Sequence, residues 1–210
     1  PHEITEVYLS GFLHHITTKK VEPVTLTFEY VSTCPATIKI GGTMYGQPAD
    51  PSKALVDAGD GVFVPWTSNT ITVKGKRIRF RGDWRNSSGN FRELFYRTFA
   101  GGHNVTMSGG FDFSGAPAIN MFRSTFIYCS NLTGPIPVGL FGNISGAPVD
   151  YMFAWTFDGC SNLTGESALM PDGVTHLYEQ FSTASGTQCI NCYRGATGLD
   201  DYATIPAAWK

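Results

Sequence analysis

The feature that most constrains this chain is an internal repeat, in which one stretch is written twice in nearly the same letters. The second copy follows the first 31 positions later, without a gap. One unit of this size cannot bury its own apolar side chains, so neighbouring units must stack and share a continuous core. The matching segments are 114–117 and 145–148, 121–122 and 152–153, 125–126 and 156–157, and 129–134 and 160–165.

A weaker third copy lies 27 positions before the first, where Leu94 and Phe95 align with the Met-Phe pairs. In this alignment Phe99 takes the place of the second aromatic residue. We therefore predict that three aromatic side chains stack in one column of the core, namely Phe99, Phe126 and Phe157.

The pattern Phe-x-x-Cys-Ser-x-Leu-Thr-Gly, followed by a Pro-containing turn, resembles the BspA-like leucine-rich repeats of bacterial surface proteins. The best match is the run from Phe157 to Thr164, followed by Pro171 to Thr175, and the resemblance covers residues 91–205. The unit length varies from 27 to 31 residues, and the longer unit exceeds the usual range of about 20–29. The resemblance therefore implies a short, irregular solenoid over residues 84–210, with a degenerate cap at its C-terminal end.

Residues 1–83 are predicted to form a separate β-rich domain. In the segment 24–31, Val24, Leu26, Phe28 and Tyr30 alternate with polar residues, which is typical of a half-buried strand. Short strands separated by turn residues indicate a small β-sandwich. We expect further strands at 37–40, 62–66, 70–73 and 77–80, an edge strand within 4–16, and one helical turn in 50–57. The predicted fold is mainly β, with the sandwich packed on the solenoid.

Composition narrows the classes of partner. Charged residues make up 15% of the chain and the net charge is -2, which gives no general reason to expect nucleic acid. No run of 18 apolar residues is present, so no membrane insertion is expected. A signal peptide is also missing, and we expect Pro1 to begin a processed or excised fragment, or a chain that lost its initiator Met.

No combination of residues predicts catalysis, a cofactor or a metal site. Cys189 and Cys192 have redox or zinc spacing, but a second ligand pair is missing, and structural thiols or a local disulfide are the simpler interpretations. The basic segment 74–81 has two readings: a contact for anionic polysaccharide or nucleic acid, or an ordinary half-buried strand with solvated arginines. We favour the second.

Candidate binding residues lie between the nearly invariant core positions of the repeat. Two residues vary there in each copy, and equivalent positions of stacked units form one extended surface. Tyr, Arg and Trp dominate binding hot spots, and aromatic rings also stack on sugars. The alternative is that these positions drift without selection, or that the Trp packs under a loop. The predicted ligand-binding residues are Tyr96, Arg97, Arg123 and Trp155.

The sequence therefore predicts a binding protein and not an enzyme. The resemblance implies an extracellular adhesion module of a bacterial surface, which recognises a protein or glycan of a host or neighbouring cell. The alternative is a structural or receptor-recognition part of a larger assembly, such as a phage tail fibre on a virion surface or a self-assembling surface filament.

Overall fold

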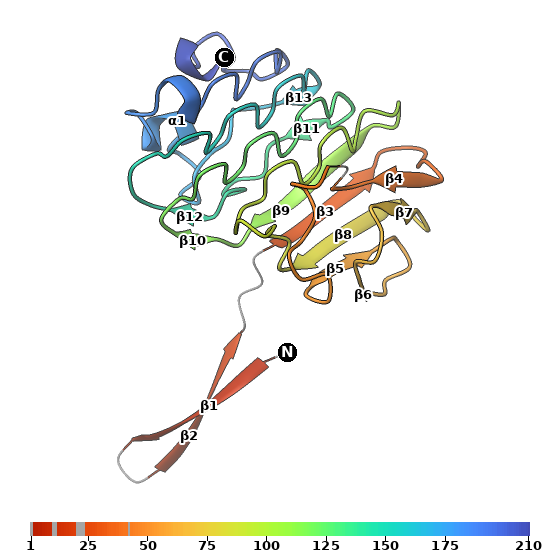
Figure 1. Cartoon of the computed structure of the whole chain (residues 1–210), viewed down its shortest axis with the longest axis vertical. Helices are drawn as coiled ribbons and strands as arrows, with labels where there is room; N and C mark the ends of the chain where they lie inside the picture. Colours follow the sequence, from red (N-terminus) through yellow and green to blue (C-terminus); the bar gives the residue numbers. More distant parts are fainter. Residues whose placement is uncertain (1, 10–11, 20–23, 42) are drawn as a thin grey trace.

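A computed structural model of the chain describes residues 2–9, 12–19, 24–41 and 43–210 (Figure 1). The fold is mainly β, as predicted, and its sheets are largely antiparallel. Helix in the described ranges is confined to three short segments near the C-terminus. These segments are α1 (Leu177–Gln180) and the 3-10 turns η1 (Gly186–Gln188) and η2 (Ala207–Trp209).

The largest sheet has five antiparallel strands in the order β6-β5-β8-β3-β9. Strand β3, which lies between β8 and β9, buries the four apolar side chains of the predicted alternation, while the residues between them face outward or are half-buried. This period-two pattern holds the strand in register, because a slip by one residue would expose the apolar set. The strands are β3 (Val24–Tyr30), β5 (Ala54–Asp57), β6 (Val64–Pro65), β8 (Arg77–Gly82) and β9 (Val105–Phe111).

Four two-stranded sheets complete the strand pairing of the described chain. The predicted edge strand within 4–16 corresponds to an antiparallel hairpin of β1 (His2–Leu9) and β2 (Phe12–Lys19). A second antiparallel pair joins β4 (Thr37–Lys39) to β7 (Thr70–Thr72). Two parallel pairs connect neighbouring repeat copies: β10 (Ser114–Gly115) with β12 (Asn143–Ile144), and β11 (Gly134–Pro135) with β13 (Leu163–Thr164).

The predicted helical turn within 50–57 is wrong, since residues 51–53 form a non-helical turn and residues 54–57 form β5. Val56 and Asp57 pair with Phe80 and Arg79 of β8. Buried Ala54 and Val56 sit on one side of the strand, so the sheet supplies more burial than a single helical turn could.

Strand β9 joins the two parts of the chain that the sequence separates at residue 83. Along its whole length β9 pairs with β3. On its other side, Val105 forms a parallel bridge with Leu132, and the Phe111 N–H donates to the Leu140 carbonyl at 2.7 Å. The same strand is therefore both the edge of the sheet and part of the first repeat copy, and the repeat region extends from it in Figure 1.

Consecutive tight turns form one side of the repeat region. Within a copy, the N–H of every second residue donates to the carbonyl three residues earlier. The N–H groups between them donate to the next copy, for example from Phe122 to Met152 at 2.8 Å and from Phe126 to Thr156 at 2.9 Å. We call this hydrogen-bonded set of turns the turn ladder, which comprises residues 91–98, 120–128, 151–159 and 188–194.

The aromatic columns correct the predicted alignment of the first copy. Phe95, and not Phe99, stacks on Phe126 at 5.5 Å, and Phe126 stacks on Phe157 at 5.4 Å. Phe99 instead contacts Phe28 of the sheet, with ring centroids 4.4 Å apart. Phe95 of the first copy therefore aligns with the second copy at an offset of 31 positions, whereas Val105 aligns with Leu132 at an offset of 27 positions. The first copy thus contains four additional residues, the length of one more turn, between its aromatic and its β9 segments.

The last row of the ladder is covered by the C-terminal tail. Tyr193 stacks on Phe157 at 5.6 Å, and its own N–H donates to the Trp209 carbonyl at 2.8 Å. The Trp209 side chain is 2% exposed and lies 5.7 Å from the Phe153 ring. The tail thereby shields the apolar end of the repeat core from water.

Candidate functional site: an aromatic–arginine face

Arginine and aromatic side chains gather on the outer side of the turn ladder. They come from three successive copies and from one loop of the N-terminal part. We call this surface the aromatic–arginine face; it comprises Tyr45, Arg92, Tyr96, Arg97, Arg123, Tyr128, Tyr151 and Trp155.

The turn geometry explains why these side chains point outward while their neighbours are buried. Arg97, Tyr128, Tyr151 and Trp155 have left-handed backbone conformations, with φ between 54° and 57°. L-residues other than glycine rarely adopt this conformation, so the surrounding hydrogen bonds must enforce it. The N–H of Arg97 donates to Ile127 at 3.0 Å, and the next copies repeat this bond.

Arg123 is held against two aromatic rings of the next copy. Its guanidinium carbon lies 4.7 Å from the centroid of the Tyr151 ring and 5.0 Å from that of Trp155. The two rings are nearly parallel, at 14° and 6.1 Å. Nη1 of Arg123 donates to Oδ1 of Asn120 at 3.2 Å. Burial lowers the pKa of Arg123, and the positive charge of Arg92 adds to this effect.

Arg97 forms a second cluster with two tyrosines. Its guanidinium carbon lies 5.1 Å from the Tyr128 ring centroid and 5.8 Å from that of Tyr96. The Arg97 side chain is exposed, and Tyr128 is 36% exposed. Cation–π contacts of this kind orient a guanidinium group without neutralising its charge.

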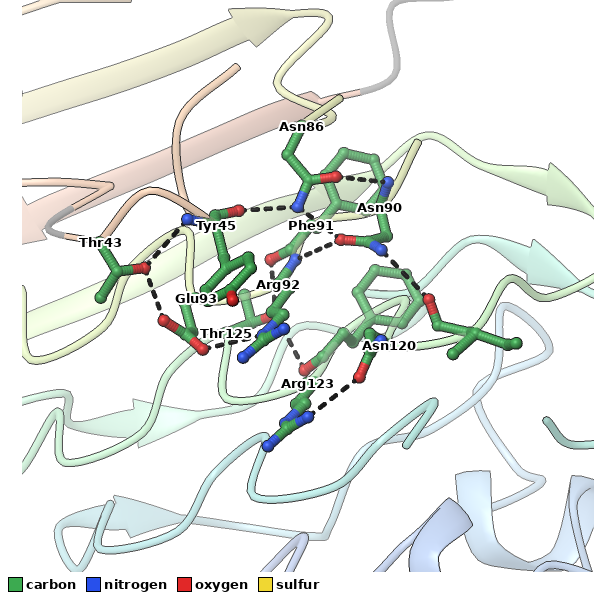
Figure 2. A network of polar contacts seen from close by, with 12 residues as sticks. Thr43, Tyr45, Asn86, Asn90, Phe91, Arg92, Glu93, Asn120, Arg123 and Thr125 are labelled. Carbon is green, nitrogen blue, oxygen red and sulfur yellow. Dashed lines mark hydrogen bonds and ion pairs between the residues drawn. The ribbon is translucent and has the colours of Figure 1, made fainter. Parts of the chain in front are cut away.

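Tyr45 and Arg92 extend the face toward the N-terminal part, as Figure 2 shows. The Arg92 guanidinium carbon lies only 3.6 Å from the Tyr45 ring centroid, and its Nε donates to Oε1 of Glu93 at 2.9 Å. The other carboxylate oxygen of Glu93 accepts a hydrogen bond from Thr43 Oγ1 at 2.5 Å. The 43–45 loop is therefore fixed against the first turns of the ladder.

The structure places all four predicted ligand-binding residues on this face but changes their equivalence. Arg123 and Trp155 share one cluster, whereas Tyr96 and Arg97 belong to the other. When the first copy is aligned with the second at an offset of 31 positions, Arg97 corresponds to Tyr128, and Arg92 corresponds to Arg123. The alignment at 27 therefore missed Arg92 and Tyr128, which an ungapped comparison at 31 would have found. Tyr45 and Tyr151 carry no signal in the repeat consensus.

Ion pairing distinguishes Arg97 and Arg123 from most other arginines of the described chain; Arg81, which lies over the Phe63 ring, shares their lack of a carboxylate partner. Arg92 pairs with Glu93, and Arg194 pairs with Asp158, whose side chain is 4% exposed. No carboxylate of the described residues lies within 4.0 Å of the Arg97 or Arg123 guanidinium group. Neither charge therefore has an acidic partner within ion-pairing distance, although Arg97 is exposed and Arg123 is half-buried.

The basic segment 74–81 lies mainly in β8 and is largely neutralised, which agrees with the ordinary-strand interpretation. Arg77 pairs with Glu29 at 2.8 Å, and Arg79 pairs with Asp57 at 2.6 Å. Lys74 pairs with Asp60 at 2.6 Å. Asp57 also accepts hydrogen bonds from Gly59 and Gly61, so its carboxylate closes a turn.

The cysteines are unpaired thiols, and four of the five are buried. The Cys129 thiol donates to the Phe95 carbonyl, and the Cys160 thiol donates to the Phe126 carbonyl, in successive copies. Burial raises the pKa of Cys129 to about 12 and that of Cys189 to about 11. Thiolates at these positions are strongly disfavoured, so these cysteines act as small core residues.

One cluster of the described residues brings together three side chains that could hold a metal ion, namely Glu166, His176 and Asp201. Asp201 uses both carboxylate oxygens to accept hydrogen bonds from Ser167, from its N–H at 2.9 Å and from its hydroxyl at 2.6 Å. The Ser167 hydroxyl also lies 3.0 Å from Nδ1 of His176, and Ser167 is buried, with 1% of its surface exposed. The cluster thus joins the last repeat to the C-terminal tail.

Comparison with family models, with curated proteins and with solved structures returned no match. None of the helices in the described ranges has the length and apolarity that a membrane span requires.

Proposed function

We propose that this chain is an extracellular adhesion or binding module of a bacterial surface, and that its aromatic–arginine face recognises a protein or glycan of another cell. In this proposal the repeat region is a short, irregular solenoid, packed on a small sandwich-like N-terminal unit. The shared strand β9 and the stacked phenylalanine columns support that architecture.

The observation that carries the functional proposal is the composition of the face. Exposed or half-buried Tyr, Trp and Arg side chains from three copies lie together there. These residue types dominate binding hot spots, because they combine large contact area with directional hydrogen bonding. They are also held in place by the turn ladder, so little side-chain freedom is lost on binding.

A triple variant with Arg97, Arg123 and Trp155 replaced by Ala tests the proposal. Fluorescently labelled protein is incubated with bacterial and mammalian cells, and bound protein is measured by flow cytometry. We expect the wild-type chain to bind one of these cell types saturably and the triple variant to lose this binding, because both arginine clusters are removed.

The control variant Arg77→Gln removes an exposed arginine of β8, whose ion pair at the surface contributes little stability. It should bind like the wild-type chain. Both variants must melt cooperatively. A folded triple variant that binds cells as tightly as the wild-type chain would contradict the proposal and move the site to the N-terminal loops.

The second candidate function, a part of a larger assembly, is favoured by the β1–β2 hairpin. These two strands pair only with each other among the described strands. An isolated two-stranded hairpin is marginally stable in water, so pairing with another chain would stabilise it. Light scattering of the full chain separates the two functions: a trimer or polymer at micromolar concentration favours the assembly, and a monomer favours the binding module.

A further inference from the structure

The charge on the aromatic–arginine face indicates what kind of ligand it takes. Arg92 and Arg194 are neutralised by Glu93 and Asp158, respectively. The Arg97 and Arg123 guanidinium groups remain without a carboxylate partner in the described structure. Each is oriented by two aromatic rings, and Arg123 by a hydrogen bond to Asn120 as well. A guanidinium group arranged in this way is suited to a bidentate contact with an anionic group of a ligand.

The two unpaired charges come from successive copies of the repeat. Arg97 belongs to the first copy and Arg123 to the second, and the N–H of Arg97 donates directly into the second copy, to Ile127. Neighbouring rows of a hydrogen-bonded ladder lie about 5 Å apart. Arg97 and Arg123 do not occupy equivalent positions of their rows, since Arg97 corresponds to Tyr128 and Arg123 to Arg92, so the two cations are offset along the rows as well as across them. Two cations placed apart on one face in this way fit an extended ligand that carries more than one anionic group.

The charge of the whole chain limits how densely charged such a polymer can be. The net charge is -2 and the pI is about 6.2, so no broad positive field surrounds the face. Nucleic-acid binding relies on a strongly basic surface that contacts many phosphates. The face instead offers two cations among several aromatic rings. This ratio fits a sugar polymer, in which apolar ring faces alternate with sparse acidic groups.

We propose, on the basis of the proposed function, that the aromatic–arginine face binds an acidic polysaccharide across the rows of the repeat. Arg97 and Arg123 contact its anionic groups, and Tyr128, Tyr151 and Trp155 contact its sugar rings. Carboxylate and sulfate groups share the chemistry that a guanidinium group recognises, and the experiment separates them.

The test measures binding of the full chain to immobilised polysaccharides by biolayer interferometry. The probes are polygalacturonate and hyaluronan, which carry only carboxylates, and chondroitin sulfate, which also carries sulfates. Carboxyl-reduced polygalacturonate and hyaluronan serve as neutral polymers with matched backbones. A poly-dT strand serves as a densely charged polymer. We expect at least one acidic polysaccharide to bind about tenfold or more tightly than its neutral counterpart, since charge-assisted hydrogen bonds are lost in the latter.

Variants assign this binding to the face. The double variant Arg97→Gln, Arg123→Gln should weaken it about tenfold or more, whereas Arg77→Gln should leave it unchanged. The variant Arg123→Lys keeps the charge but loses the planar fork, so it should bind more weakly than the wild-type chain and more tightly than Arg123→Gln. Affinity of the wild-type chain should also fall with added salt.

Three outcomes would overturn the inference: no acidic polysaccharide binds, the neutral polymers bind equally well, or poly-dT binds more tightly than every acidic polysaccharide. Retention of affinity by a folded Arg97→Gln, Arg123→Gln variant would overturn it as well. These results leave the proposed function standing if the wild-type chain still binds cells and the triple Ala variant does not. Failure of that cell assay would instead remove the proposed function itself.

Discussion

Single residues of the turn ladder alternate between core and surface within very short distances along the chain. Phe126 is fully buried between Phe95 and Phe157, while Tyr128, two residues later, is 36% exposed and contacts Arg97. The buried ring fixes the row and the exposed ring forms part of the face. Binding and stability should therefore respond to different substitutions, although the residues are near neighbours.

Replacing Phe126 with Ala should lower the free energy of unfolding by roughly 3–5 kcal/mol, because transfer energy is lost and a cavity remains between two rings. Urea denaturation followed by circular dichroism measures this change. Val138 is 57% exposed, so Val138→Ala should change the unfolding free energy by less than about 0.5 kcal/mol. A loss below about 1 kcal/mol for Phe126→Ala would mean that the aromatic column does not carry the core.

The buried thiols predict a loss of stability at alkaline pH. Burial raises the pKa of Cys129 from 9.0 to about 12 and raises that of Cys160 as well. Between about pH 9 and pH 12 the unfolded chain releases these protons while the folded chain retains them, so the free energy of unfolding must fall as pH rises. Urea denaturation at pH 7.5 and pH 10.5 should show this decrease. In Cys129→Ala the decrease should be smaller, and an identical decrease would contradict the assignment.

At the scale of the elements, the sequence reveals the strands better than the turns. The alternation around Phe28 predicts β3 because its period of two is regular. The turn ladder has no comparable signal, since its left-handed positions hold Glu93, Ser124 and Trp155 in place of glycine. Residue type therefore does not mark these turns, and only hydrogen bonds between copies define them. For the same reason the sequence located half of the aromatic–arginine face and misaligned its first copy.

The backbone at Ser124 is left-handed, with φ of 55°. Glycine should therefore be more stable than alanine at this position, which is the reverse of the usual order. Ser124→Gly should be more stable than Ser124→Ala by about 1 kcal/mol, because Cβ strains this conformation. Ser130 serves as the control position, because its φ is not positive. At Ser130 the Ala variant should be more stable than the Gly variant, by up to about 1 kcal/mol. Thermal or urea denaturation of the four variants provides the comparison. The same order at both positions would contradict the ladder geometry.

At the scale of the whole molecule, β9 connects the two parts that the sequence separates at residue 83, because it pairs with β3 on one side and contacts the second repeat copy on the other. Phe28 of β3 contacts Phe80, Phe95 and Phe99, so one aromatic cluster spans both predicted domains. The composition of each half does not reveal this connection, because the pairing of β9 with β3 is a long-range contact that no local sequence pattern marks.

A fragment of residues 84–210 should therefore fail to fold alone, since β9 would lose β3 and the Phe95 and Phe99 rings would be exposed. The complete chain should melt in one transition when tyrosine and tryptophan fluorescence and circular dichroism are compared. A fragment with dispersed amide resonances and a cooperative melt would show two independent domains instead.

The central claim is that ligands bind on the outer side of the turn ladder. Hydrogen–deuterium exchange of the full chain, with and without saturating amounts of its tightest-binding polysaccharide, tests this claim most directly. We predict slower exchange in peptides that cover residues 91–98, 120–128 and 151–159, and unchanged exchange in β5, β6 and β7. Protection confined to those three strands and their loops, with none on the ladder, would contradict the account.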